Sequence, residues 1–139
     1  MIILKTSKFF EFTIDYPPTK AGKTAWNRTY GLNAYYAGKH WAQRKKDAEY
    51  WHILTHAAIR RADHTPPMFD VPVMIEMWFN DNLDCSNHAA MFKMIEDGMK
   101  GMIIPDDSRK YVHGAAMYFH DEPYIRVRVR CVAKLINQC

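Results

Sequence analysis

Residues 123–132 alternate between apolar and charged side chains, and this pattern limits the possible folds more than any other in the chain. The apolar positions are Ile125, Val127 and Val129, and the charged positions are Arg126, Arg128 and Arg130. A period of two places successive side chains on opposite faces of a strand, so the segment predicts a strand with one buried face. A sheet with one buried face needs a second layer packed against it.

Three other segments predict strands. Residues 8–15 mix aromatic and β-branched side chains and end at two prolines, residues 71–79 alternate loosely, and residues 110–119 precede a short turn. Residues 17–38 contain three glycines and show little apolar periodicity, so we expect a long loop there.

Two segments predict helices. Apolar residues recur at helical spacing over residues 40–61. A second helix is expected to begin at Ser86 or Asn87, because both side chains can cap a helix, and to end near Lys100, where Gly101 follows.

The predicted order is β-α-β-α-β-β, an α+β domain with a small mixed sheet and two helices on one face. We expect a single domain over residues 1–139, because a chain of 139 residues supports one core. No apolar run approaches the roughly 18 residues that span a bilayer, and the first five residues are too short for a signal-peptide core. The sequence therefore predicts a cytoplasmic protein.

Charge is distributed unevenly along the chain. No acidic residue occurs between Asp15 and Asp47, whereas residues 81–107 are rich in acids. The basic residues of the first stretch are Lys20, Lys23, Arg28, Lys39, Arg44, Lys45 and Lys46. The acids of the second are Asp81, Asp84, Glu96, Asp97, Asp106 and Asp107. This division is typical of a protein that holds a polyanion beside a metal site, although random surface variation also explains it.

The acidic stretch contains residues that can perform chemistry. On a helix that begins near Ser86, Lys93 and Asp97 share its face. Asp97 lies roughly 16 Å along the axis from Ser86, too far to bind the same ion as Asp84. The side chain of Lys93 leans toward the helix N-terminus and thus toward Asp84.

The turn at Asp106 and Asp107 supplies a second acidic element. If it returns beside the helix N-terminus, one of its carboxylates meets Asp84 there. Carboxylates without histidine or thiolate partners favour Mg²⁺ or Mn²⁺, which activates water and neutralises phosphoryl charge. The alternative is a solvated turn together with an acid that favours the helix dipole.

This segment resembles the signature of RusA-type Holliday-junction resolvases. In that family an Asp-x-Asp-Asn motif opens a helix, a lysine and an aspartate four residues apart follow, and an Asp-Asp turn precedes a strand. The matching residues here are Asp84, Ser86, Asn87, Lys93, Asp97 and the run Ile104-Pro105-Asp106-Asp107-Ser108. Residues 32–46 are similar to the family's Asn-x-Tyr-Tyr and basic-helix region, so the resemblance covers about residues 8–130.

The resemblance implies a homodimeric, Mg²⁺-dependent endonuclease, with Mn²⁺ as a substitute, that resolves four-way DNA junctions by paired nicks in a bacterial or phage-infected cell. By position, Asp84 and Asp107 match catalytic metal ligands, and Lys93 matches a lysine implicated in activity. Asn87 and Asp97 match supporting positions.

Ser86 departs from the family pattern, because it stands where the family has its second aspartate. A hydroxyl at a ligand position is weaker, so Asp106 and Asp81 become candidates to complete the site. Two alternatives follow: a catalytically weak or inactive protein that binds branched DNA, and an interaction or inhibitor module that reuses the fold.

The DNA-binding surface is expected where aromatic and basic residues interleave. Its predicted members are Asn33, Tyr35, Tyr36, Lys39, His40, Arg44, Lys45 and Lys46. Such aromatics stack on bases or pack against sugars, although they also anchor loops to a core. The arginines of residues 123–132 are open to two interpretations, a phosphate-facing stripe or a solvated or edge-strand face.

Overall fold

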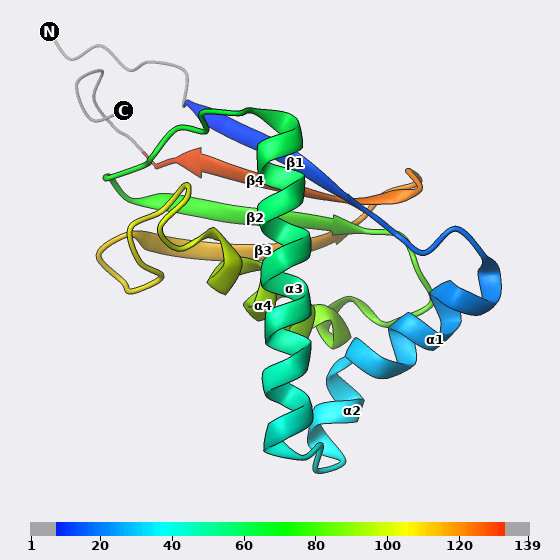
Figure 1. Ribbon diagram of the computed structural model, residues 1–139. Coiled ribbons are helices and arrows are strands. Elements are labelled where there is room, and N and C mark those ends of the chain that lie inside the picture. The colour runs from blue at the N-terminus through cyan, green and yellow to red at the C-terminus, as the bar shows by residue number, and fades with distance from the viewer. Residues whose placement is uncertain (1–7, 133–139) are drawn as a thin grey trace, which may run out of the picture.

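The computed structural model describes residues 8–132 (Figure 1). The elements are β1 (Phe9–Asp15), α1 (Lys20–Tyr30), α2 (Leu32–Tyr36), α3 (Trp41–Ala62), β2 (Val73–Phe79), the 3-10 helix η1 (Cys85–His88), α4 (Ala89–Met99), β3 (Val112–Phe119) and β4 (Tyr124–Cys131). The predicted α+β class and the order of the four strands and two long helices are confirmed. Within these residues, none of the helices combines the length and the apolar character that crossing a membrane requires.

The four strands form one mixed sheet in the order β1-β4-β2-β3. β4 pairs antiparallel with β1 and with β2, and β2 pairs parallel with β3. Although β4 directly follows β3 in the chain, it lies between β1 and β2 (Figure 1). β4 is therefore an inner strand, and the interpretation of its arginines as protection for a sheet edge is wrong.

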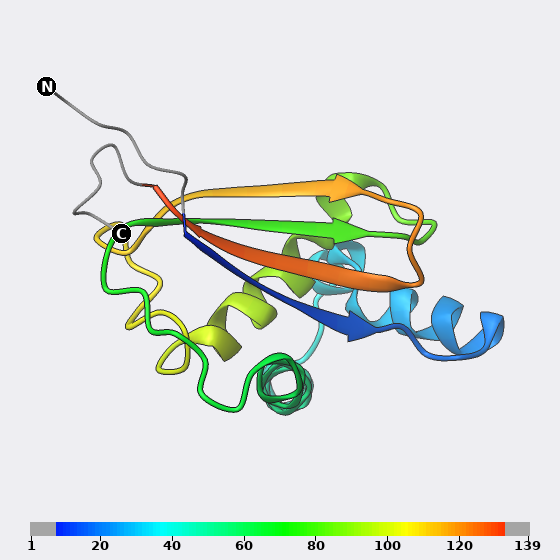
Figure 2. The same cartoon turned by 90° about the horizontal axis from the view of Figure 1, so that it is seen from above.

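Both inner strands pack one face against helices, and no described helix covers the other face (Figure 2), on which Glu76 is nevertheless buried. Ile125, Val127 and Val129 of β4 are fully buried, as the alternation predicted. Ile75 and Met77 of β2 are buried on the same face. The long helices α3 and α4 lie on this side of the sheet, and no helix covers the opposite side of the described sheet (Figure 2). The core is thus a single layer between the sheet and two helices.

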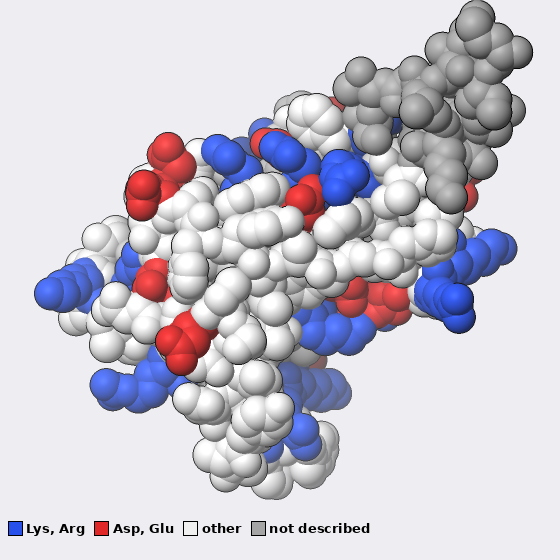
Figure 3. All heavy atoms as spheres, turned by 180° about the vertical axis from the view of Figure 1, so that it is seen from behind, with Lys and Arg blue, Asp and Glu red and all other residues white. Residues whose placement is uncertain are grey.

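The arginines of β4 lie on the open face and are largely paired. Arg128 forms an ion pair with Glu11 of β1 at 2.7 Å, and Arg130 forms one with Glu76 of β2 at 3.0 Å. Figure 3, which views this side of the molecule, shows blue and red groups next to one another among neutral atoms. Because carboxylates already neutralise two of the three arginines, the stripe is better explained as a cross-strand ion-pair network than as a phosphate-binding surface.

The long loop predicted for residues 17–38 is wrong, because most of this segment folds into α1 and α2. Thr19 caps α1 by accepting a hydrogen bond from the backbone N–H of Gly22 at 2.9 Å. Trp26 of α1 stacks on the fully buried Trp51 of α3, with ring centroids 4.9 Å apart. The aromatic contacts that hold α1 against α3 are tertiary, so local periodicity could not reveal them.

The second helix also begins differently from the prediction. A 3-10 turn over residues 85–88 precedes α4, and neither Ser86 nor Asn87 caps it. The residues at the two cap positions are Asp84 and His88, and neither side chain makes a capping hydrogen bond. His88 instead bonds through its ring Nδ1 to the carbonyl oxygen of Cys85 at 2.9 Å, which closes the turn.

A buried ion pair joins this turn to the end of β2. The Nε2 of His88 lies 2.7 Å from Asp81 Oδ1, and the hydroxyl of Tyr16 donates to Asp81 Oδ2 at 2.8 Å. Both side chains of the pair are fully buried. Both ring nitrogens of His88 face oxygen atoms, one of Cys85 and one of Asp81, so hydrogen-bond contacts engage both sides of the ring. Burial alone would raise the pKa of Asp81, but hydrogen bonds from His88, the Leu83 backbone and Tyr16 outweigh it and hold that pKa below its ordinary value.

We expect Asp81→Asn to lower the free energy of unfolding at pH 7 by about 3–5 kcal/mol, since it removes the carboxylate of a buried pair and disrupts the contacts of His88 and Tyr16. The contribution of a carboxyl with a lowered pKa is full above about pH 4, the ordinary range of an aspartate, and is lost as pH falls through the folded-state pKa. Urea unfolding from pH 7 to pH 3 should therefore show the difference from wild type shrink. Asp70→Asn, at an exposed position, is the control, and a pH-independent difference would contradict the ion-pair assignment.

Candidate functional site

Two basic and three acidic side chains gather along the outer face of α4 and the segment after it. Lys93 and Asp97 are four residues apart on the helix, and Lys93 Nζ lies 3.0 Å from Asp97 Oδ1. Glu96 Oε1 lies 3.4 Å from the same ammonium, and Lys100 reaches Asp97 at 3.4 Å. The predicted common face for Lys93 and Asp97 is confirmed.

A chain reversal after α4 brings in the remaining acid. Gly101 adopts a left-handed φ of 79°, and its N–H donates to the carbonyl oxygen of Ile104 at 2.7 Å. The turn that follows then lies beside α4, where Asp107 accepts a hydrogen bond from Lys93 and lies 3.6 Å from Lys100. Lys93 is thus the central contact of the cluster.

Opposite charges shift the protonation equilibria of these groups. The hydrogen bond from Lys93 lowers the pKa of Asp107 to about 2. Burial would lower the pKa of Lys93, but the carboxylates of Asp107 and Asp97 outweigh it and raise that pKa above its ordinary value. The pKa of Glu96 is raised, chiefly by burial and against the opposing effect of Lys93. Asp107 is therefore a carboxylate and Lys93 an ammonium at neutral pH.

The three carboxylates of the cluster can converge on one cation. Ligand oxygens of Glu96, Asp97 and Asp107 all lie within 4.8 Å of one another. The donors are oxygens alone, which suits a hard ion such as Mg²⁺ or Mn²⁺ rather than zinc. The ammonium of Lys93 contacts all three acids, so a cation and this lysine compete for the same oxygens.

The predicted site residues are divided by this geometry. Lys93 and Asp107 lie together. Among the described residues, the acids whose carboxylate oxygens lie close enough to Asp107 to share a metal ion are Glu96 and Asp97, and Asp84 is not in this group. Asp84 and Ser86 are exposed at the start of η1, and Asp106 is exposed in the turn. Asp81, a candidate to replace the missing aspartate, is buried, and its carboxylate contacts His88 and Tyr16.

The reason for this division is the direction of the chain after α4. The turn at residues 105–108 returns beside α4, because the reversal at Gly101 comes immediately after Lys100, the C-cap residue of the helix. Sequence reasoning did not include Glu96 in the site. Its spacing of three residues from Lys93, which puts the two side chains on adjacent helix positions, was the available signal.

The predicted DNA-binding residues also separate into two groups. Lys39 forms an ion pair with the buried Asp47 and donates to the carbonyl oxygen of Thr29 at 2.8 Å. Tyr35 donates to Asp47 at 2.7 Å. These contacts tie α2 to α3, so Lys39 and Tyr35 have structural partners. His40 accepts from the Ala42 N–H at 3.2 Å and caps α3.

The other predicted residues are open to solvent. Tyr36 is 81% exposed, and the neighbouring Trp41 is 66% exposed. Arg44, Lys45 and Lys46 on the first turns of α3 are exposed and form no ion pair within residues 8–132. This end of α3 and α2 projects away from the sheet in Figure 1. Asn33, also exposed, lines a cavity of about 330 Å³ that includes Asn87.

Comparison with known proteins identifies no relative: no protein-family model, curated protein or solved structure matches this chain.

If the acidic cluster binds a cation, Lys93→Met should tighten Mn²⁺ binding by roughly tenfold, or about 1.4 kcal/mol, because it removes the competing ammonium. Isothermal titration calorimetry of the full chain measures the affinity directly. Lys110→Met, a change at an exposed lysine outside the cluster, should leave it unchanged. The absence of Mn²⁺ binding in both wild type and Lys93→Met would exclude the cluster as a cation site.

Proposed function

We propose that this chain is a metal-dependent endonuclease that cleaves four-way and related branched DNA. The observation that carries the proposal is the contact between Lys93 and Asp107, two residues of the sequence motif that lie 14 positions apart in the chain. Asp97, the third member of that part of the motif, contacts the same lysine.

The residues of the cluster suit phosphodiester chemistry. Asp107, Asp97 and Glu96 would hold a Mg²⁺ ion, which when bound supplies an activated water and positive charge at the phosphate. Asp107 is ionised over the whole physiological range and needs no proton loss to act as a ligand. Lys93 has a side chain that is 58% exposed, so its ammonium can turn from the carboxylates toward a phosphate.

The basic end of α3 supports DNA as the substrate. Arg44, Lys45 and Lys46 are three exposed cations without an ion-pair partner among residues 8–132, and Tyr36 and Trp41 are exposed nearby in the chain. Cations bind phosphates and aromatic rings stack on bases, and branched DNA presents both duplex arms and less regular nucleotides at the crossover.

We further propose that the protein acts as a homodimer in a bacterial or phage-infected cell. A four-way junction has near two-fold symmetry and needs two nicks, which a closed two-fold dimer delivers. The apolar residues of β4 and the methionines of α4, such as Met91 and Met94, are buried in the core and are not available to a partner. Symmetry of the substrate is therefore the argument for the dimer.

Asp107→Asn is expected to reduce Mg²⁺-dependent nicking of a labelled four-way junction by about 100-fold or more, since it removes a charged ligand and the partner of Lys93. Junction binding in EDTA should stay within about twofold of wild type, because the mutation lies outside the basic surface. Asp84→Asn, tested in parallel, shows whether that exposed acid joins the site when DNA and metal are bound. The control is Asp70→Asn, and full activity of Asp107→Asn would remove this residue from the active site.

Replacement of Arg44, Lys45 and Lys46 by glutamine should weaken junction binding and its dependence on salt. Each lost duplex-phosphate contact lowers the slope of log K against log salt by about 0.9. Fluorescence anisotropy across a salt series measures this slope. The matched triple change Arg60→Gln, Arg109→Gln and Lys110→Gln removes the same charge from other exposed positions. Equal slopes for the two triple variants would show that the α3 residues do not contact DNA.

A second candidate function is branched-DNA binding without cleavage. It is favoured by Ser86, an exposed hydroxyl where the family pattern has an aspartate, and by the separation of Asp84 from the carboxylates around Lys93. Junction binding without nicking, in Mg²⁺ and in Mn²⁺, would select this function over the endonuclease.

A further inference from the structure

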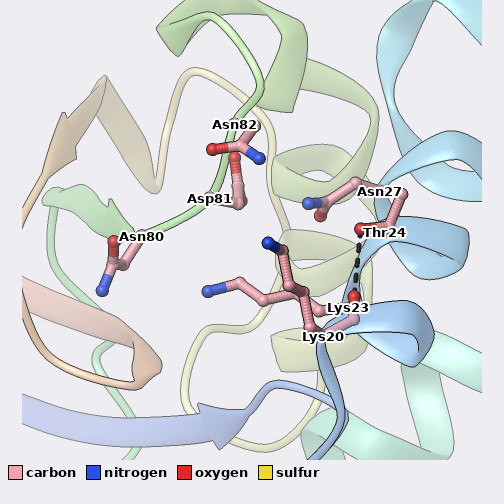
Figure 4. Close-up of a pocket in the computed structure, with 7 residues that line it drawn as sticks. All are labelled: Lys20, Lys23, Thr24, Asn27, Asn80, Asp81 and Asn82. Carbon is pink, nitrogen blue, oxygen red and sulfur yellow. Dashed lines mark hydrogen bonds between the residues drawn. The ribbon is translucent and has the colours of Figure 1, made fainter.

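A polar pocket of about 230 Å³ lies between α1 and the segment that follows β2 (Figure 4). One face of α1 forms one wall through Lys20, Lys23, Thr24 and Asn27, which recur at helical spacing. Residues 80–82 form the opposite wall. At about 30 Å³ per water molecule, the space corresponds to roughly eight waters, enough for a phosphate group and part of its sugar.

The pocket has excess positive charge. The ammonium groups of Lys20 and Lys23 extend from α1 toward residues 80–82 (Figure 4). Neither forms an ion pair with any residue between 8 and 132. Lys23 is held over the ring of Tyr16, with 4.3 Å between its Nζ and the ring centroid. The one acid of the lining, Asp81, points away from the lysines, and its carboxylate contacts His88 at 2.7 Å.

A buried amide without a partner also faces this space. Asn27 is only 8% exposed, and its Oδ1 has no hydrogen-bond partner among the described residues. Its side chain points from α1 toward Asp81 and Asn82 (Figure 4). A buried polar atom is normally paired, so this amide has capacity for a bound group.

A second cavity shares a lining residue with this pocket. Asn27 also lines the adjacent cavity of about 330 Å³, whose other lining residues include Arg28, Leu83 and Asn87. The second cavity is also lined by residues 31–34, and Asn27 belongs to both linings. The basic residues of the two linings, Lys20, Lys23 and Arg28, thus all come from α1.

We propose that the pocket between α1 and residues 80–82 binds a phosphate group of a DNA strand, held by Lys20 and Lys23, with the Asn27 amide bonded to the attached nucleotide. The choice of a DNA strand, rather than free phosphate, rests on the proposed function. The phosphate chemistry rests on the pocket alone.

The test uses the full chain in EDTA, so that it is independent of cleavage. Backbone amide spectra are recorded with a single thymidine strand of about 12 nucleotides and, separately, with inorganic phosphate. We expect shifts in residues 20–27 and 80–82 with both, and saturation at a much lower concentration of the strand. Lys20→Gln with Lys23→Gln should weaken strand binding about tenfold and lower the salt slope by about 0.7, the value for one single-strand phosphate.

The matched control is Lys8→Gln with Lys110→Gln, which removes two exposed lysines outside the pocket, each of which, like Lys23, lies over an aromatic ring. Asn82→Asp adds a carboxylate at the exposed rim without disturbing the core, and should weaken binding of both probes. Shifts confined to other residues, or equal affinities of the two double variants, would overturn the proposal. Binding of inorganic phosphate without the strand would overturn the DNA source. A chain that fails to nick junctions but passes these tests would refute the endonuclease function and leave this pocket supported.

Discussion

The one-sided burial of the sheet is the constraint on which the positions of the other elements depend. β2 and β4 present alternate apolar residues to one side, and α3 and α4 must cover it to keep those residues from water. The helices approach each other closely at Gly98, where an added Cβ would lie 2.9 Å from the Cβ of the fully buried Thr55. With the inner side of α4 occupied by core residues, Lys93 and Asp97 are left on its outer side.

The acidic cluster follows from that placement together with one reversal of the chain. α4 supplies Lys93 and, one turn later, the adjacent acids Glu96 and Asp97. Gly101, which has a left-handed φ, then directs the next segment back along the helix. Asp107 then contacts the ammonium of Lys93, a residue that belongs to α4 and not to the turn. Electrostatic attraction across the two elements stabilises both the turn and the ionised form of Asp107, so the stability of this region and the protonation state of Asp107 have the same origin.

The helices α1 and α2 connect the two surfaces assigned to DNA. Aromatic contacts with Trp51 hold α1 in place, and the network of Lys39, Tyr35 and Asp47 holds α2 against α3. The face of α1 that points toward residues 80–82 forms one wall of the pocket that we propose as a phosphate site, whereas the joint between α2 and α3 exposes Tyr36 and Trp41. Some of the cations and aromatics in this basic stretch stabilise the fold, and others remain free for a ligand.

The sequence by itself determined the strands, the two long helices, their order and the common face of Lys93 and Asp97, because periodicity is a local property of the backbone. Only the tertiary structure decided that residues 20–36 are helical, since aromatic packing on α3 stabilises them. It also decided that β4 lies inside the sheet, and that Asp107 meets Asp97 and Glu96 rather than Asp84. These outcomes depend on contacts between segments distant in the chain, and neither residue spacing nor helix propensity encodes the direction in which a turn returns.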